Sequence, residues 1–139
     1  MASIFLGAYW GARPEEREVV AGKVSKLMCG MSIISPVFAR WFKLGVSRKK
    51  ANSEIDLSEL SILQLLNTNK RDTDKTPIVE LGFDFHAWNG GSSSVAIRAG
   101  VFSSLVSNGF VLKVSESLSE PQWRSLCELA VSTLDPDEL

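Results

Sequence analysis

The sequence predicts an α+β domain in which helices pack on one face of a mainly antiparallel sheet of about four strands. Two patterns carry this prediction. Apolar residues alternate with a period of two near the N-terminus and again in the second half of the chain, where Asn-Gly pairs separate the runs. Elsewhere, apolar residues recur at helical spacing behind side-chain caps and prolines. The predicted order of elements is β-α-α-α-β-β-β-α.

The first strand is predicted at residues 3–10, where the apolar even positions alternate with a more mixed set. Pro14 follows at a position typical of a first helical turn, and Glu15 and Glu16 suit the positive end of the helix dipole. Apolar residues then recur at helical spacing as far as Met31. This pattern predicts a helix from about residue 14 to residue 30.

Two shorter helices are predicted next. Ser35 and Pro36 repeat the start signal, and Gly45 can end the helix that they begin. The apolar residues on one side of this helix are Phe38, Trp41 and Phe42. Asp56 or Ser58 can cap a third helix, whose apolar face consists of Leu60, Leu63 and Leu66, widened by Ile62 and Leu65. Residues 67–76 contain no apolar side chain, which predicts a solvated loop.

The clearest strand is predicted after Pro77, because the odd positions from Val79 to Ala87 are apolar. The opposite face of this strand carries Glu80, Gly82, Asp84, His86 and Trp88. Asn89-Gly90-Gly91 then predicts a hairpin turn into a second strand at about residues 95–101. A third strand follows Asn108-Gly109, and a capping box at residues 119–122 begins a last helix that ends before Pro136.

Length and composition indicate one domain over residues 1–139, with 45% hydrophobic and 22% charged residues. No stretch approaches the apolar length of a membrane span, and the first residues lack the basic region of a secretory signal. We therefore expect a cytoplasmic protein with no membrane partner. A net charge of −1 argues against direct binding of nucleic acid, although Arg40 beside Trp41 and Phe42 could stack on a single strand.

Catalytic groups are scarce. His86 is the only histidine, and the chain has no Walker loop, Rossmann fingerprint or pair of ligands at zinc spacing, so we predict no cofactor and no metal. Glu80, Asp84 and His86 could nevertheless approach one divalent cation from the polar face of their strand. A small metal-dependent hydrolase is thus the alternative function. The commoner explanation is that a half-buried strand displays polar residues to solvent.

Recognition of another protein is favoured instead, because the same polar face ends at Trp88. An aromatic side chain beside acidic residues is typical of a binding hot spot for a basic partner, whereas packing of Trp88 under a loop is the alternative. The predicted binding residues are Glu80, Asp84, His86, Trp88 and Asn89. The other aromatic clusters are interpreted as structural, and comprise Tyr9, Trp10, Phe38, Trp41, Phe42 and Trp123.

Five motifs follow one another along most of the chain. They are Ala8-Tyr9-Trp10-Gly11-x-Arg13, Pro36-Val37-Phe38-Ala39-Arg40-Trp41-Phe42-x-x-Gly45-x-Ser47-Arg48-Lys49-x-Ala51, Glu80-Leu81-Gly82-Phe83, Trp88-Asn89-Gly90 and Asp135-Pro136-Asp137. In this order they resemble the immunity protein 52 family of bacterial polymorphic toxin systems. The long central motif and the flanking tryptophans are the specific part of the resemblance.

The resemblance implies an α+β immunity protein rather than an enzyme. Members are encoded beside toxins with a restriction-endonuclease-like nuclease domain, so it implies an antitoxin that binds such a toxin and protects the producer, in a type VI secretion setting. An acidic surface would suit the positively charged cleft of a nuclease. Neither the contact residues nor the oligomeric state follows from the family pattern, and its tryptophans can equally be scaffold.

Overall fold

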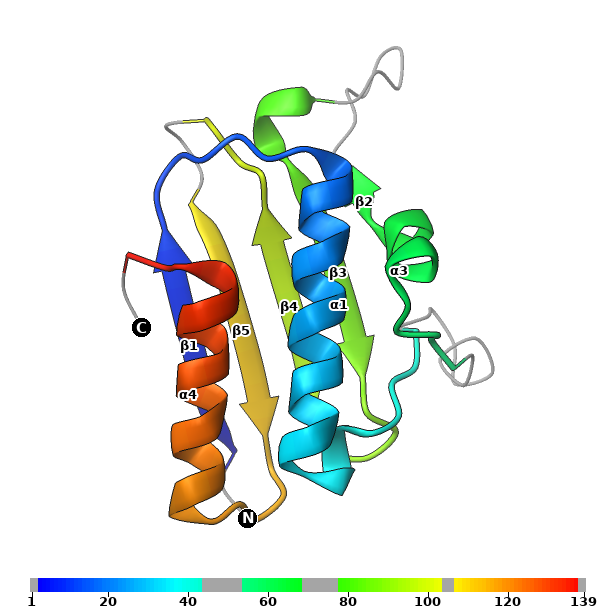
Figure 1. The fold of residues 1–139 in the computed structure, drawn as a ribbon, viewed down its shortest axis with the longest axis vertical. Coiled ribbons are helices and arrows are strands. Elements are labelled where there is room, and N and C mark those ends of the chain that lie inside the picture. The colour runs from blue at the N-terminus through cyan, green and yellow to red at the C-terminus, as the bar shows by residue number, and fades with distance from the viewer. Residues whose placement is uncertain (1–2, 44–53, 69–77, 104–106, 138–139) are drawn as a thin grey trace.

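A five-stranded antiparallel sheet forms the centre of the protein, with strand order β1-β5-β4-β3-β2 (Figure 1). The computed structural model describes residues 3–43, 54–68, 78–103 and 107–137. The strands are β1 (Ile4–Trp10), β2 (Asn67–Thr68), β3 (Phe83–Trp88), β4 (Ser94–Ala99) and β5 (Asn108–Val114). The first strand pairs with the last, and the other three strands complete an open sheet.

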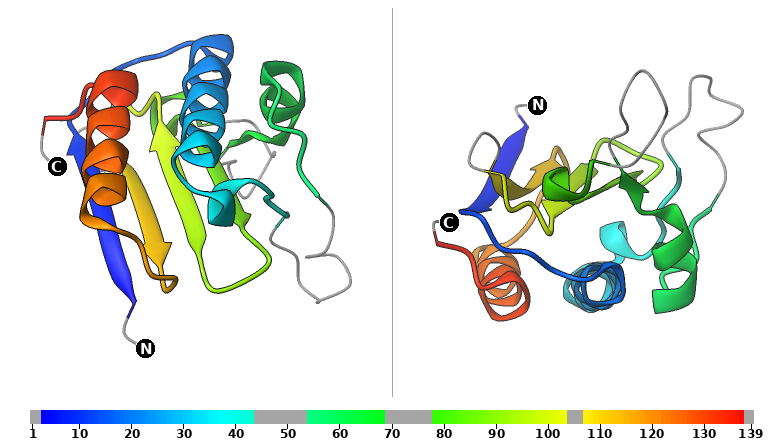
Figure 2. Two further views of the ribbon diagram at one scale, coloured as in Figure 1. Left: turned by 60° about the horizontal axis from the view of Figure 1, so that its bottom comes forward. Right: turned by 90° about the horizontal axis from the view of Figure 1, so that it is seen from above.

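Helices α1 (Arg17–Ile34), α3 (Glu59–Leu65) and α4 (Glu120–Leu134) all lie on the same face of this sheet, as the view from above shows (Figure 2). The predicted α+β class is therefore confirmed. The sheet has one strand more than the expected four or so, because Asn67 and Thr68 pair with Asp84 and Phe83 at its edge. No helix in the described ranges is long and apolar enough to cross a membrane.

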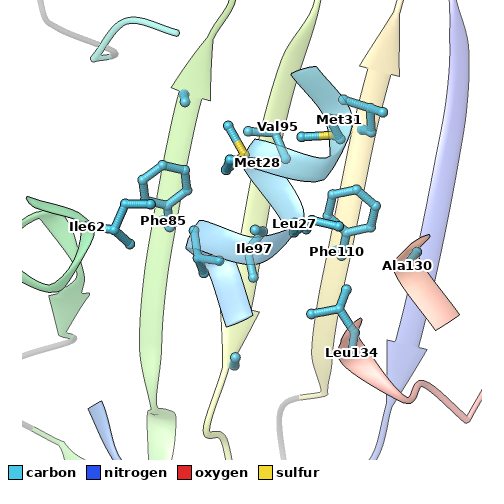
Figure 3. Close-up of a cluster of buried hydrophobic side chains, with 14 of the residues drawn as sticks. Leu27, Met28, Met31, Ile62, Phe85, Val95, Ile97, Phe110, Ala130 and Leu134 are labelled. Atoms are coloured by element: carbon cyan, nitrogen blue, oxygen red, sulfur yellow. The ribbon is translucent and has the colours of Figure 1, made fainter. Parts of the chain in front are cut away.

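The hydrophobic core lies between the helices and the sheet (Figure 3). Helix α1 crosses its centre and presents Leu27, Met28 and Met31 to the strands, where Phe85 and Phe110 are also buried. The alternation predicted for β3, β4 and β5 places their apolar positions here, since successive strand residues point to opposite faces. Each fully buried large apolar side chain stabilises the fold by roughly 1.5–3 kcal/mol.

The prediction of a short helix after Ser35 is wrong. Only Pro36–Phe38 form a 3₁₀ turn, which the Ser35 hydroxyl caps by accepting from Val37 N. The Trp41 ring stacks on Phe38 at 6.0 Å and donates its indole N–H to the Phe38 carbonyl over 2.8 Å. The backbone of Phe42 then pairs with Trp88 at the sheet edge, which a helix would prevent. Residues 44–53, including the central motif from Gly45 onwards, lie outside the described ranges.

The first predicted helix is shifted along the chain, because α1 begins at Arg17 rather than Pro14 and continues through Gly30 to Ile34. The third is confirmed, with Ser58 as its cap, but Leu60 is 75% exposed and Ile62 instead supplies the buried apolar contact. The capping box of α4 is present, and this helix ends at Leu134 before a left-handed residue, Asp135.

The strand predicted from Val79 begins four residues later than expected. Residues Val79–Leu81 form a 3₁₀ turn, and Gly82 ends it with φ of 63°. A Cβ atom at Gly82 would lie 2.3 Å from the Ala99 carbonyl oxygen, so only glycine fits this close crossing. Glu80 consequently does not share a strand face with Asp84 and His86, which corrects the sequence-based arrangement of these three residues.

Candidate functional site

The face of the sheet opposite the helices is left open by the described part of the chain (Figure 2). We call it the open face. Strand register aligns its side chains in three rows that run across four strands. The rows are Tyr9, Gly109, Arg98 and Asp84; Gly7, Val111, Ala96 and His86; and Phe5, Lys113, Ser94 and Trp88. Asp84, His86 and Trp88 therefore share one surface, as the alternation predicted.

Tyr9 is the aromatic residue of the first row, and 47% of it is accessible to solvent. It lies across two glycines of the sheet. A Cβ atom at Gly7 would be 2.8 Å from the Tyr9 hydroxyl, and one at Gly109 would be 3.3 Å from Cδ1 of the ring. The missing side chains thus leave room for the ring to lie over the backbone of Gly7 and Gly109.

A shallow hollow of about 260 Å³ adjoins this ring on the open face. Its polar walls come from Asp84, His86 and Arg98, and its apolar floor includes Ala96 and Val111. An apolar floor with a few convergent polar groups is the usual composition of a recognition site. The hollow therefore marks the part of the open face best suited to receive a side chain of another molecule.

Asp84 is paired within the sheet. Arg98 Nε donates to Asp84 Oδ1 over 2.9 Å, and the two residues face each other directly on β3 and β4. With Glu80 displaced to the 3₁₀ turn, the acidic patch expected on this face does not form. The open face carries mixed charge instead. Arg98 lies in the same row as Asp84, and Lys113 lies in the row next to that of His86.

Trp88 lies at the end of the third row and is half-buried. Its indole N–H donates to the Gly91 carbonyl over 2.7 Å, and its ring packs at 6.1 Å and 54° to Phe42. The backbone groups of the two residues exchange hydrogen bonds of 2.7 and 3.0 Å. Trp88 thus combines a structural contact with a partly exposed ring, and its role as a binding residue stays a prediction.

Asn89 uses its side chain to build the turn between β3 and β4. Its Oδ1 accepts from the backbone N–H groups of Gly91 and Ser93, each over 3.0 Å, and its amide donates to Val37 O and to Glu116 Oε1. These bonds hold the loop that carries Trp88. Asn89 therefore has a structural role, because it fixes the turn at the edge of the open face.

Glu116 completes this turn, although sequence reasoning did not single it out. Partial burial raises the pKa of its carboxyl group, but hydrogen bonds from Asn89 and Ser93 and from the backbone of Glu116 and Ser92 outweigh that effect and lower the pKa from 4.5 to about 2. The turn thus holds an ionised carboxylate. Tyr9, which was interpreted as structural, is instead 47% exposed on the open face. Arg98 was not singled out by the sequence analysis. Strand register places both residues in one row with Asp84.

The metal-dependent alternative loses the geometry on which it depended. Glu80 lies on the 3₁₀ turn, and the Asp84 carboxylate is occupied by Arg98. Within the described ranges, His, Cys, Asp and Glu side chains form no group of three that could hold a metal ion. His86 is exposed on the open face.

Several residues of the sequence motifs join the two ends of the chain. Arg13 donates to the carbonyl oxygens of Leu134 and Asp135 over 2.7 and 2.6 Å, and its guanidinium group lies 5.5 Å from the centroid of the buried Trp10 ring. Gly11 N donates to Asp137 Oδ2 over 2.8 Å. We call this arrangement the terminal clasp. Its residues act as scaffold, as do the buried Phe38 and Trp41 and the partly buried Trp123.

The immunity protein 52 family matches residues 2–127, a span that contains every strand together with α1 and α3 and ends within α4. The Asp135-Pro136-Asp137 motif lies beyond the matched span. No curated protein sequence matches the chain. Because the family match covers most of the sequence, the chain belongs to the immunity protein 52 family.

Proposed function

We propose that this immunity protein acts in the cytoplasm, where it binds a cognate nuclease toxin of a type VI secretion system through the open face of its sheet. Membership of the immunity protein 52 family supports the antitoxin role. The observation that carries the choice of surface is the exposed Tyr9 ring beside the hollow lined by Asp84, His86 and Arg98. Tyrosine and arginine are enriched among residues that dominate binding energy.

The chemistry of this face indicates how the toxin is held. A tyrosine loses little conformational entropy on binding, and its hydroxyl can bond to the partner. Asp84 and Arg98 present a hydrogen-bonded ion pair rather than a net negative charge. We therefore expect burial of aromatic and apolar surface to supply most of the affinity, with only a shallow dependence on salt concentration.

The residues at the ends of β3 have flanking roles in this proposal. Trp88 supplies a second aromatic contact at the far row, and Asn89 holds the turn that carries it. Glu80 is exposed on the 3₁₀ turn before β3, where it would meet a basic residue at the rim of a nuclease cleft. A charge at a rim mainly accelerates association, so its loss should change the association rate more than the affinity.

The test uses a catalytically inactive form of the toxin encoded by the adjacent gene. Isothermal titration calorimetry should give a complex with wild-type protein. Tyr9→Ala should weaken binding by about 2 kcal/mol, or roughly thirtyfold, as expected for a central aromatic anchor. His86→Ala should weaken it less. Val131→Ala on the solvent side of α4 is the matched control, because Val131 is as exposed as Tyr9 but lies on the helical layer.

Two results would count against the proposal. If no complex forms at micromolar concentrations, the toxin encoded next door is not the partner. If the complex forms but a folded Tyr9→Ala variant binds as tightly as wild type while Val131→Ala does not, the interface lies on the helical layer. Circular dichroism of each variant shows whether it is folded, so that loss of binding can be assigned to loss of a contact.

A further inference from the structure

The two edges of the sheet are protected differently. Beyond β3, the two-residue strand β2 covers one end, and the backbone of Phe42 pairs with Trp88 at the other. Beyond β1, no strand or helix of the described ranges continues the sheet (Figure 1). Sheet edges are normally covered or interrupted, because their free N–H and C=O groups can pair with another strand. The exposed edge of β1 therefore requires an explanation.

Hydrogen bonding identifies the backbone groups at this edge. Asp137 N donates to the Tyr9 carbonyl over 2.9 Å, so this carbonyl points away from β5. Antiparallel pairing alternates the direction of backbone groups, and the N–H and C=O groups of Phe5 and Gly7 must then point outward as well. The terminal clasp occupies only the end of the edge at Tyr9. Within the described ranges, no hydrogen bond to Phe5 or Gly7 comes from outside the sheet.

The side chains of β1 offer none of the usual protection. Residues 2–12 contain no charged residue and no proline, the two residue types that most often discourage pairing at an edge. Ile4 and Phe5 are 53% and 64% exposed and point to opposite faces of the sheet. The edge thus combines free backbone groups with apolar side chains on both sides.

We propose that β1 pairs antiparallel with β1 of a second copy of this chain about a two-fold axis, which joins the two sheets into one. The edge is complementary to itself, because a copy turned by the two-fold axis offers the same donors and acceptors in reverse order. Ile4 and Phe5 of one copy would cover those of the other, and the uncharged strand sets no like charges against each other. Since the clasp occupies Tyr9 O, the axis lies nearer Phe5 than Tyr9.

Sedimentation equilibrium of the purified full-length chain tests this pairing without any toxin, so its outcome is independent of the proposed function. Wild-type protein should be dimeric at micromolar concentrations. Phe5→Lys should weaken the dimer at least about tenfold, because two ammonium groups would then face each other across the axis. Ile33→Lys is the matched control, since it places the same charge on an exposed apolar position of α1 and should leave the dimer intact.

A charge-exchange experiment identifies the contact itself. Phe5→Glu alone should be monomeric like Phe5→Lys, whereas an equimolar mixture of the two folded variants should form a heterodimer through opposite charges at the axis. A wild-type monomer at the highest attainable concentration would overturn the proposal. A dimer that persists in Phe5→Lys, or a mixture that stays monomeric while both variants are folded by circular dichroism, would also overturn it.

Discussion

The two faces of the sheet are built from the same strands but have different properties. One face carries Phe85, Ile97, Phe110 and Leu112 and is closed by helices, whereas the other carries His86, Ala96, Val111 and Tyr9 and is left open. Most residues of the family motifs serve the closed face, the edges or the terminal clasp. The comparison teaches that the motifs mark mainly the scaffold of this chain, whereas Tyr9 and Trp88 are motif residues that also reach the open face.

The largest expected effect is on the closed face. Trp41→Ala removes a fully buried ring that stacks on Phe38, and it leaves a cavity together with an unpaired Phe38 carbonyl group. We expect the free energy of unfolding to fall by about 3–5 kcal/mol in urea denaturation. Tyr9→Ala on the open face should cost about 1 kcal/mol or less. Similar losses in the two variants would contradict the distinction between the faces.

An intermediate loss of stability is expected for a buried polar residue of the closed face. Asn108 is fully buried; its amide donates to the carbonyl oxygens of Gly11 and Val101 over 2.8 and 3.0 Å, and its Oδ1 accepts from Val101 N over 2.8 Å. Asn108→Ala leaves buried backbone groups unpaired, so we expect a loss of about 2–3 kcal/mol in the same denaturation assay.

Asn67→Ala serves as the control for Asn108, because Asn67 is an exposed residue of the same type in a strand. Its replacement should change the free energy of unfolding by about 0.5 kcal/mol or less. If the two variants lose the same amount, the buried hydrogen bonds of Asn108 do not hold the start of β5 to the chain around Gly11.

The smallest expected change in stability concerns Glu116, which contacts the turn between β3 and β4. Its pKa is lowered from 4.5 to about 2 in the folded protein, so its carboxylate stabilises the fold above pH 4.5 and loses this contribution as the pH falls towards 2. Because the group is partly exposed, we expect a loss of about 1 kcal/mol over this interval.

Glu116→Gln tests this assignment in thermal unfolding as a function of pH. The variant should be less stable than wild type near neutral pH, and the difference should shrink between pH 4.5 and 2. A constant difference over that interval would show that the Asn89 turn does not depend on the charge of residue 116. Glu120→Gln is the matched control, since Glu120 is an exposed glutamate at the start of α4.

Local patterns predicted most of the fold. Alternation identified β3, β4 and β5, and the Ser119 capping box identified α4, because these signals act over a few neighbouring residues. The short helix at Phe38 failed for the opposite reason. The conformation of Phe42 is decided by its pairing with Trp88, which is distant in sequence. A crossing with Ala99 likewise requires Gly82 and displaces Glu80 from the strand.

The candidate site was predictable only in part. Asp84, His86 and Trp88 share a face because they lie at alternate positions of one strand. Arg98 and Tyr9 come from other strands, and only register places Arg98 beside Asp84 and Tyr9 further along the same row. The Asp84–Arg98 ion pair, which changes the charge of this face, follows from that register. The turn at Asn89-Gly90-Gly91 predicted that β3 and β4 are neighbours, but local patterns indicated neither their register nor the position of β1 beside β5.

The terminal clasp has a consequence for how the chain folds during synthesis. Strand β1 precedes the other described strands along the chain, yet the described strand that pairs with it is β5, and the Arg13 acceptors lie at residues 134 and 135. The hairpin of β3 and β4 can form earlier, whereas β1 must wait until β5 has left the ribosome. Pairings between residues far apart in sequence are slow to form. An uncharged apolar strand is therefore exposed for longest in the nascent chain, when it is most prone to aggregate.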